Sequence, residues 1–187
     1  MNYNPETLVV NLFAGPGAGK TTAATDIFSE LKWSGVNAEY VPEWIKNMVW
    51  EGREKVFQNQ LYVFGKQHYN ISRLLGEVDV IVTDSPLLFS SFYNKLLSET
   101  FDKFVFEEFL KFSNMNYFVN RIKSYNSKGR LETEDEAKEN DIKIKKMLDK
   151  NNIKYTDIEG NKKGATMVVN DVLYYLTKKG KLYYEYL

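Results

Sequence analysis

Short apolar runs alternate along the chain with longer stretches in which apolar residues recur every three or four positions. The run at 7–13 (TLVVNLF) is continuous and rich in β-branched residues, which is typical of a strand buried on both faces. Residues 20–33 have helical periodicity and end just before Gly35, a C-terminal cap, and 36–41 predicts a second strand that stops at Pro42. The start of the chain therefore predicts a strand–helix–strand unit.

The same alternation continues to the other end of the chain. Helical periodicity over 43–75, broken near Gly52, predicts two helices. Further strands are predicted at 78–83, 116–122 and 153–158, further helices at 87–112, 134–150 and 165–177, and a polar loop at 123–133. We expect a three-layer α/β fold: a mostly parallel five-stranded sheet flanked by helices, forming a single domain over residues 1–187.

Composition narrows the class of protein. The chain has 187 residues, 25 basic and 25 acidic, so no basic field favours nucleic acid as the main partner, although a local basic rim is compatible with it. There is no cysteine, which excludes disulfides and thiolate metal sites. No apolar run reaches the roughly 18 residues of a membrane span, and no signal peptide is visible, so we expect a cytoplasmic protein. An excess of Lys, Asn and Tyr hints at an AT-rich microbial or phage genome, in which case the location is the host cytoplasm.

One motif carries specific chemistry. Ala14-Gly15-Pro16-Gly17-Ala18-Gly19-Lys20-Thr21, followed by Thr22, fits the phosphate-binding loop G-x-x-x-x-G-K-[ST], with alanine in place of the first glycine. Its glycines let backbone N–H groups converge on an anion at a helix N-terminus. Lys20 would bridge the β- and γ-phosphates and the Thr21 hydroxyl would bind Mg²⁺. We expect ATP and Mg²⁺ as cofactors, because no guanine-recognition signature is present.

Beyond this loop the sequence resembles the P-loop nucleoside and nucleotide kinases, near the deoxynucleoside, thymidylate and ribosylnicotinamide kinase branches. Four further segments carry the resemblance: VPEW at 41–44, FQNQLYVFGKQHY at 57–69, VIVTDSP at 80–86 and RIKSYNSKGR at 121–130. The resemblance spans nearly the whole chain and implies the P-loop NTPase fold with a lid at about 121–133.

Two acids are the candidates for general base. The resemblance places Glu43 where deoxynucleoside kinases have the acid that takes the proton of the acceptor hydroxyl. The alternative is that Glu43 is an acid at a helix start that only interacts favourably with the helix dipole. Asp84, at the end of an apolar strand, is expected to hold Mg²⁺ through water, or to be the base if Glu43 is not. In these kinases an arginine follows the corresponding acid, whereas Ser85 follows here, which leaves phosphate clamping to another cation, with Arg53 and Arg73 as candidates.

The resemblance also implies an acceptor pocket and a lid. Trp44 would stack on an acceptor ring or else belong to the core. Gln60 and Gln67 are seven positions apart and share a helix face, where their amides would read a nucleobase edge or else be exposed to solvent. Arg121 and Arg130 bracket the polar loop and, as lid arginines, would contact the transferred phosphoryl group; the alternative is two solvated arginines.

We therefore expect an ATP-dependent kinase that transfers the γ-phosphoryl group to a small acceptor, a nucleoside or (deoxy)nucleoside monophosphate. Two alternatives remain open: a kinase acting on modified bases in DNA or on polynucleotide ends, and an ATP-hydrolysing switch or binding module. The sequence leaves the oligomeric state open, and a homodimer is compatible with it.

Overall fold

The computed structural model of the chain describes residues 6–122, 124, 125 and 132–181. Five parallel strands form one sheet in the order β2-β3-β1-β4-β5. The strands are β1 (Leu8–Phe13), β2 (Ala38–Val41), β3 (Val80–Thr83), β4 (Ser113–Asn120) and β5 (Thr156–Glu159). The helices are α1 (Lys20–Trp33), α2 (Lys46–Trp50), the 3-10 helix η1 (Glu54–Gln58), α3 (Gln60–Ser72), α4 (Phe89–Phe92), α5 (Glu99–Leu110), α6 (Glu134–Lys150) and α7 (Lys162–Lys178). The structure confirms the predicted fold class, and the sheet is wholly parallel.

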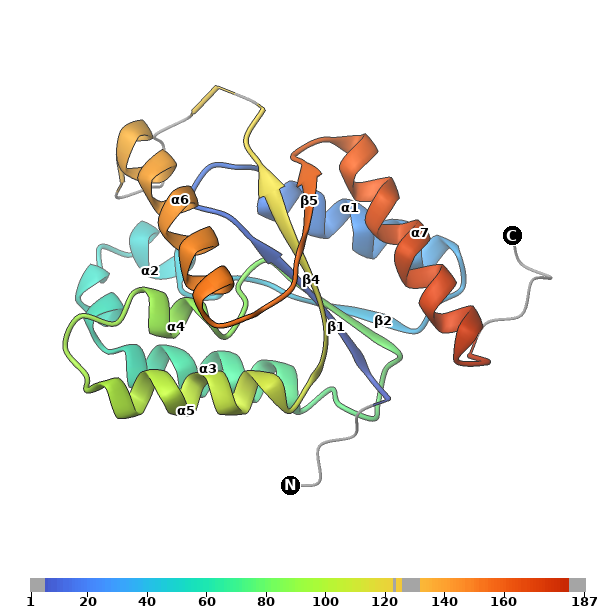
Figure 1. Cartoon of the computed structure of the whole chain (residues 1–187), viewed down its shortest axis with the longest axis horizontal. Helices are drawn as coiled ribbons and strands as arrows, with labels where there is room; N and C mark the ends of the chain where they lie inside the picture. Colours follow the sequence, from blue (N-terminus) through green and yellow to red (C-terminus); the bar gives the residue numbers. More distant parts are fainter. Residues whose placement is uncertain (1–5, 123, 126–131, 182–187) are drawn as a thin grey trace.

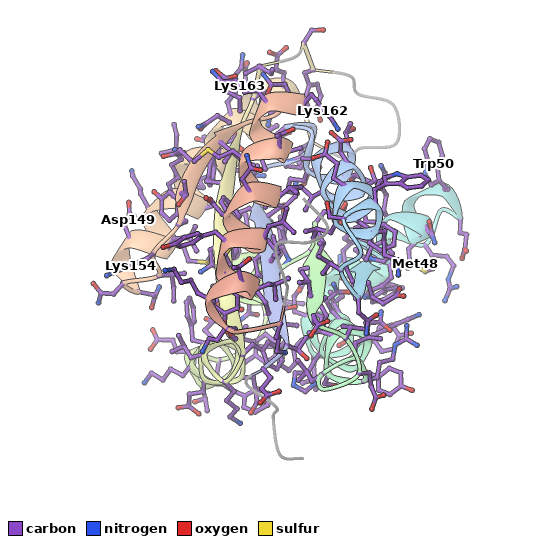
Figure 2. The ribbon with its side chains drawn as sticks, turned by 90° about the vertical axis from the view of Figure 1, so that its right-hand side faces the viewer. Met48, Trp50, Asp149, Lys154, Lys162 and Lys163 are labelled. Atoms are coloured by element: carbon purple, nitrogen blue, oxygen red, sulfur yellow. The ribbon has the colours of Figure 1, made fainter. Side chains whose placement is uncertain are left out.

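Helices cover both faces of the sheet, which makes three layers (Figure 1). α1 and α7 lie side by side on one face, and α3, α5 and α6 lie on the other. Lys162, at the start of α7 in Figure 2, donates to Asp26 at 2.9 Å and also bonds Glu30, both on α1. These surface ion pairs add to the apolar contact between the two helices.

The core lies along the two central strands. Every residue of β1 and β3 is buried, as continuous apolar runs between two helical layers require. β1 pairs with β3 through Asn11 and Thr83 and with β4 through Phe13 and Phe118. The carboxyl ends of these strands therefore meet at one edge of the sheet.

Three of the predictions need correction. The two helices expected over 43–75 are three segments in the structure, α2, η1 and α3. The helix expected over 87–112 is wrong in its middle, because the structure has the short α4 and then α5, with residues 93–98 between them. The Asn94 side chain accepts from the backbone N–H of Leu97 at 2.9 Å, and such a bond competes with the helical ladder. β4 begins three residues before the predicted strand, because Asn114 and Asn116 accept from the buried Asn11 side chain at 2.9 and 3.0 Å. The first four residues of β4 are half-buried and mostly polar, so the apolar pattern did not indicate them.

The starts of two further helices are set by their N-terminal caps. The capping box predicted at the start of α6 is present: the Thr133 hydroxyl accepts from the N–H of Glu136, and the Glu136 carboxylate accepts from the N–H of Thr133. α7 begins at Lys162, three residues before the predicted helix, because the Asn161 side chain accepts from the N–H of Gly164. Within the part of the chain that the structure describes, none of the helices combines the length and apolar character that crossing a membrane requires.

Candidate active site

The predicted site residues from four strands gather at the carboxyl edge of the sheet. The phosphate loop follows β1, Glu43 follows β2, Asp84 follows β3 and Arg121 follows β4. Parallel strands bring such residues together because all their carboxyl ends lie on one side, where open α/β sheets bind ligands. The edge therefore holds acids, cations and free backbone amides within one small region.

The phosphate loop adopts a conformation that only glycine tolerates well. Gly17 has φ +76° and Gly19 has φ +103°, both in the left-handed region. Gly19 is also the N-terminal cap of α1, so the first unpaired N–H groups of that helix close the loop. The loop is thus shaped to place amides around an anion at a helix N-terminus.

Lys20 lies over the same loop. Its Nζ donates to the carbonyl oxygens of Ala14 at 2.9 Å and Gly15 at 3.0 Å. Burial lowers the pKa of Lys20, while the nearby carboxylates of Glu43 and Asp84 oppose the shift. A partly desolvated ammonium gains more from a phosphate than from two carbonyls, which makes it a suitable phosphate ligand.

Thr21 and Asp84 form the most direct contact between two candidate residues. The Thr21 hydroxyl donates to Asp84 Oδ2 at 2.6 Å, and Asp84 Oδ1 accepts from the backbone N–H of Glu43 at 2.9 Å. The described residues contain no cluster of three or more His, Cys, Asp or Glu side chains that could hold a metal by themselves. A hydroxyl beside one carboxylate instead suits Mg²⁺, which retains waters and takes its other ligands from phosphate. The residues present therefore fit Mg²⁺ bound together with a nucleotide.

Glu43 differs from Asp84 in its environment. Burial raises the pKa of Glu43, the charge of Asp84 adds to the shift, and the ammonium of Lys20 opposes it. Burial also raises the pKa of two tyrosines near these acids, Tyr40 and Tyr93. A carboxyl group with a raised pKa in a cavity is better suited to accept a proton than one whose oxygens are both engaged.

A cavity of about 520 Å³ opens beside the phosphate loop. Its floor includes Gly17, Lys20 and Thr21, and one wall carries Glu43. The remaining lining comes from the segment 45–67 and from residues 85–96, together with Glu132, and includes Ile45, Phe57, Val63, Pro86, Phe89 and Tyr93. The cavity thus combines apolar walls with charged and amide side chains that could orient a small molecule.

Gln60 and Gln67 both line this cavity and both are buried, so neither is the solvent-exposed glutamine of the alternative interpretation. The Gln60 amide N–H₂ donates to the Phe57 carbonyl at 2.7 Å, and that of Gln67 donates to the Ser85 carbonyl at 3.0 Å. Each carbonyl fixes the orientation of the amide that faces it. If the amide were flipped, its oxygen would face the carbonyl oxygen, and two acceptors would lie against each other. In the part of the chain described, both buried amide oxygens lack a hydrogen-bond partner.

Trp44 lies outside the cavity lining. Its ring makes an edge contact with Tyr62, with 5.5 Å between ring centroids, and the Lys66 ammonium lies 4.2 Å from its centroid. The structure therefore does not bring Trp44 together with the other candidates for acceptor binding. Trp50 at the end of α2, labelled in Figure 2, is exposed to solvent.

Arg121 lies beside the phosphate loop. A Cβ added to Gly17 would lie 3.2 Å from its Nη1, and its Nη2 donates to Asp141 at 3.2 Å. Arg130 and most of the predicted lid lie outside the described residues. Arg53 is exposed and paired with Glu51, and Arg73 is exposed at the end of α3, so neither reaches the cavity.

Three residues at the site were not predicted from the sequence: Asp141, Glu132 and Tyr93. Asp141 lies on the highly charged α6, where an acid that faces the loop looks like any other acid of a solvated helix. Tyr93 lies in the segment wrongly predicted to be helical. Only the packing of α6 and the break after α4 bring these residues to the site.

The chain is similar to one protein family and to several solved structures. The family described as "AAA domain" matches residues 9–163. No curated protein shows significant similarity to the chain. Similar solved structures include one titled "Crystal structure of APE1195" (21% identity over 90% of this chain and 95% of that chain, TM-score 0.44). A shikimate kinase from Bacteroides thetaiotaomicron is 11% identical over 91% of this chain and 98% of that chain, with a TM-score of 0.45. A shikimate kinase from Acinetobacter baumannii in complex with shikimate is 19% identical over 95% of this chain and 97% of that chain, with a TM-score of 0.48.

Proposed function

We propose that this chain, which belongs to the AAA-domain family, is an ATP-dependent kinase that phosphorylates a hydroxyl group of an unphosphorylated nucleoside. The observation that carries the proposal is the cavity itself, which has the phosphate loop as its floor and the Glu43 carboxyl group in its wall. A nucleotide-hydrolysing site needs room for one water molecule, whereas this cavity has room for a second substrate.

The nucleotide and the acceptor would approach the phosphate loop from different sides. A second hollow, of about 400 Å³, lies between α1 and the start of α7 and is lined by Thr22, Asp26, Asn161 and Lys162 among others. We assign this hollow to the nucleoside part of ATP and the larger cavity to the acceptor. The γ-phosphoryl group would then lie between the two substrates, as in-line transfer requires.

Each candidate residue has a role in this arrangement. Mg²⁺-ATP would supply the electrophilic phosphoryl group. The loop amides, Gly17 to Thr22, would hold the phosphates, and Lys20 would neutralise charge on the transferred oxygens. The Thr21 hydroxyl and the Asp84 carboxylate would orient the metal. Glu43 would accept the proton of the attacking hydroxyl, since its raised pKa brings it closer to neutral pH and Asp84 has both oxygens occupied.

Two features favour a nucleoside over a nucleoside monophosphate. Recognition of a phosphate commonly uses the two-pronged donor geometry of arginine, yet the described part of the cavity wall includes no arginine, only Lys20, Lys46 and Lys95 as cations. The wall also carries two acids, Glu43 and Glu132, which would repel a second phosphate.

The two glutamines indicate which edge of the acceptor faces them. Their N–H₂ groups are taken up by backbone carbonyls, and their oxygens are buried without a described partner. Leaving such an acceptor unpaired costs about 1–3 kcal/mol, which a donor on the ligand would recover. Uridine and inosine also carry a ring N–H donor, but they place a carbonyl oxygen where cytidine and adenosine carry an amino group. We therefore expect the amino nucleosides to be better acceptors, because a carbonyl oxygen that faces the glutamine oxygens would be repelled.

An ATP-hydrolysing module is the second candidate, favoured by the family description. The two functions differ in how ADP release depends on an acceptor. In a screen of matched pairs (cytidine and uridine, adenosine and inosine, and the corresponding monophosphates), the kinase predicts faster ADP release with the amino nucleosides. ADP release at one rate with every acceptor and with none would favour the hydrolysing module.

A further inference from the structure

The carboxylate of Asp141, on α6, joins two parts of the site that come from different strands. Its Oδ1 accepts from the backbone N–H of Gly15 at 2.5 Å, and its Oδ2 accepts from Arg121 Nη2 at 3.2 Å. The Arg121 side chain is 10% exposed and that of Asp141 is 19% exposed. Both oxygens of one largely buried carboxylate thus connect the first turn of the phosphate loop with the end of β4.

Direct packing of α6 on the loop sets this contact. A Cβ at Gly15 would lie 2.5 Å from the carbonyl oxygen of Ala137 and 2.9 Å from Asp141 Oδ1. Any larger residue would push the helix away from the loop. Glycine at position 15 therefore permits the close approach of α6 that brings Asp141 to the loop amide.

Arg121 is left with donors to spare. Its Nε and Nη1 are buried and have no hydrogen-bond partner in the described part of the chain. Nη1 lies close to the phosphate loop, 3.2 Å from a Cβ built at Gly17, and the guanidinium lies over the Tyr125 ring with 5.8 Å to its centroid. A buried guanidinium with two unpaired N–H groups is costly unless an anion fills the space. The carboxylate of Asp141 balances its charge through the contact with Nη2.

We infer that Asp141 is a positioning residue, which holds the phosphate loop and Arg121 in the arrangement that nucleotide binding requires. The inference rests on the proposed function only in taking a nucleotide as the ligand of the loop. A purely structural ion pair between α6 and β4 is the alternative, and the two differ in what removal of the carboxylate changes. The structural pair would affect unfolding, whereas the positioning residue would affect nucleotide affinity.

The test compares Asp141→Asn and Asp141→Ala with Arg121→Ala and the Asp141→Ala/Arg121→Ala double variant. Asparagine keeps an acceptor for Gly15 but loses the charge that faces Arg121. The dissociation constant for a non-hydrolysable Mg²⁺-ATP analogue is measured together with the thermal unfolding temperature. Glu139→Gln is the matched control, because Glu139 lies on the same helix and pairs with Lys143 at the surface.

We expect Asp141→Asn to weaken analogue binding about 10-fold and Asp141→Ala about 100-fold, as for other buried charge pairs that lose one partner. Glu139→Gln should bind as the parent does. In the double variant the two losses should be less than additive, because both act through Arg121. Unfolding temperatures should differ by only a few degrees between Asp141→Asn and Glu139→Gln, so that lost affinity is not lost folding.

Two results would overturn the inference. Parent-like analogue binding by Asp141→Asn and Asp141→Ala would assign the carboxylate to structure alone, and fully additive losses in the double variant would separate Asp141 from Arg121. In both cases the parent still binds the analogue, so the proposed function stands. A parent that binds no nucleotide would instead remove the proposed function and this inference together.

Discussion

The hydroxyl of Thr21 donates to the carboxylate of Asp84 at 2.6 Å, although 63 positions separate the two residues. β1 and β3 are neighbours in the sheet, so the residues that follow them meet at its carboxyl edge. Because Mg²⁺ in a nucleotide site takes a hydroxyl and a nearby carboxylate as its protein ligands, we propose this pair as the place where the metal binds.

Thr21→Val tests that pair. Valine keeps the shape of threonine but removes the hydroxyl, so we expect the Mg²⁺ concentration needed for half-maximal activity to rise and kcat to fall about 100-fold. The measurement is a Mg²⁺ titration of ADP release at saturating ATP. Thr177→Val is the matched control, since Thr177 lies on α7 outside the lining of both cavities and its hydroxyl donates to the Leu173 carbonyl of its own helix. An unchanged Mg²⁺ dependence in Thr21→Val would contradict the assignment.

The raised pKa of Glu43 predicts a pH dependence of activity. A general base acts only when deprotonated, so the rate should rise with pH through a midpoint above the ordinary glutamate value of 4.5. Glu43→Gln should lower kcat about 100- to 10,000-fold and abolish this limb of the profile. The check is kcat against pH for parent and variant. If Glu43→Gln retains both its rate and the limb, another group is the base.

Glu43 also predicts that stability changes with pH in the direction opposite to the rate: the rate rises with pH and the stability falls. The folded protein holds the Glu43 proton more tightly than the unfolded chain does. Protonated Glu43 therefore contributes to stability, fully at a pH below the ordinary glutamate pKa, and this contribution is lost as the pH rises through the raised pKa of the folded protein. Glu43→Gln should therefore unfold at a higher temperature than the parent at pH 8 and show a smaller advantage at pH 5. Equal unfolding temperatures at both pH values would argue against burial as the cause of the shift.

A comparison of Gly17 with Gly35 tests whether Gly17 contributes to nucleotide binding as well as to the backbone conformation. Gly17→Ala places a methyl group 2.9 Å from the Tyr125 ring, and Gly35→Ala at a similar φ of +78° meets nothing within 4 Å. Gly35→Ala should destabilise the fold by about 1–2 kcal/mol, the cost of a left-handed conformation, and Gly17→Ala by more, because its methyl group also clashes with the Tyr125 ring. Only Gly17→Ala should also weaken binding of the ATP analogue, measured by calorimetry. Equal affinities for the two variants would mean that the loop backbone does not contact the phosphates.

Gln67 is expected to set the preference for amino nucleosides. Gln67→Met keeps the length of the side chain and removes its acceptor, so the KM for cytidine should rise about 10-fold while the KM for uridine changes little. The KM for ATP serves as the internal control and should stay constant. A uniform rise for both nucleosides would assign Gln67 to packing of the cavity wall instead of recognition.

The sequence was informative wherever function depends on local order. The phosphate loop, Glu43 and Asp84 each follow a strand directly, so the apolar runs that predict the strands also predict where these residues lie. The common face of Gln60 and Gln67 follows from helical periodicity in the same way. The helical periodicity does not specify which direction this face points. The direction is set by the packing of α3 on the sheet.

Residues that act across elements were not visible in this way. Asp141 reaches Gly15 only because α6 packs on the loop, a contact between residues 126 positions apart. The break between α4 and α5, which brings Tyr93 to the cavity, depends on the Asn94 side chain in a segment whose periodicity is otherwise helical. Trp44 is the opposite case, a residue whose position in the sequence suggested the cavity but whose side chain lies elsewhere. It follows a strand, as the site residues do, but its ring packs on Tyr62 and Lys66.

Transfer of labelled phosphate from [γ-³²P]ATP is the most direct measurement of the central claim, that the chain moves a phosphoryl group onto a nucleoside. The parent protein with Mg²⁺ and cytidine or adenosine should produce a labelled nucleoside monophosphate, and Lys20→Ala should produce none. Labelled inorganic phosphate as the sole product, whichever nucleoside is added, would contradict the account.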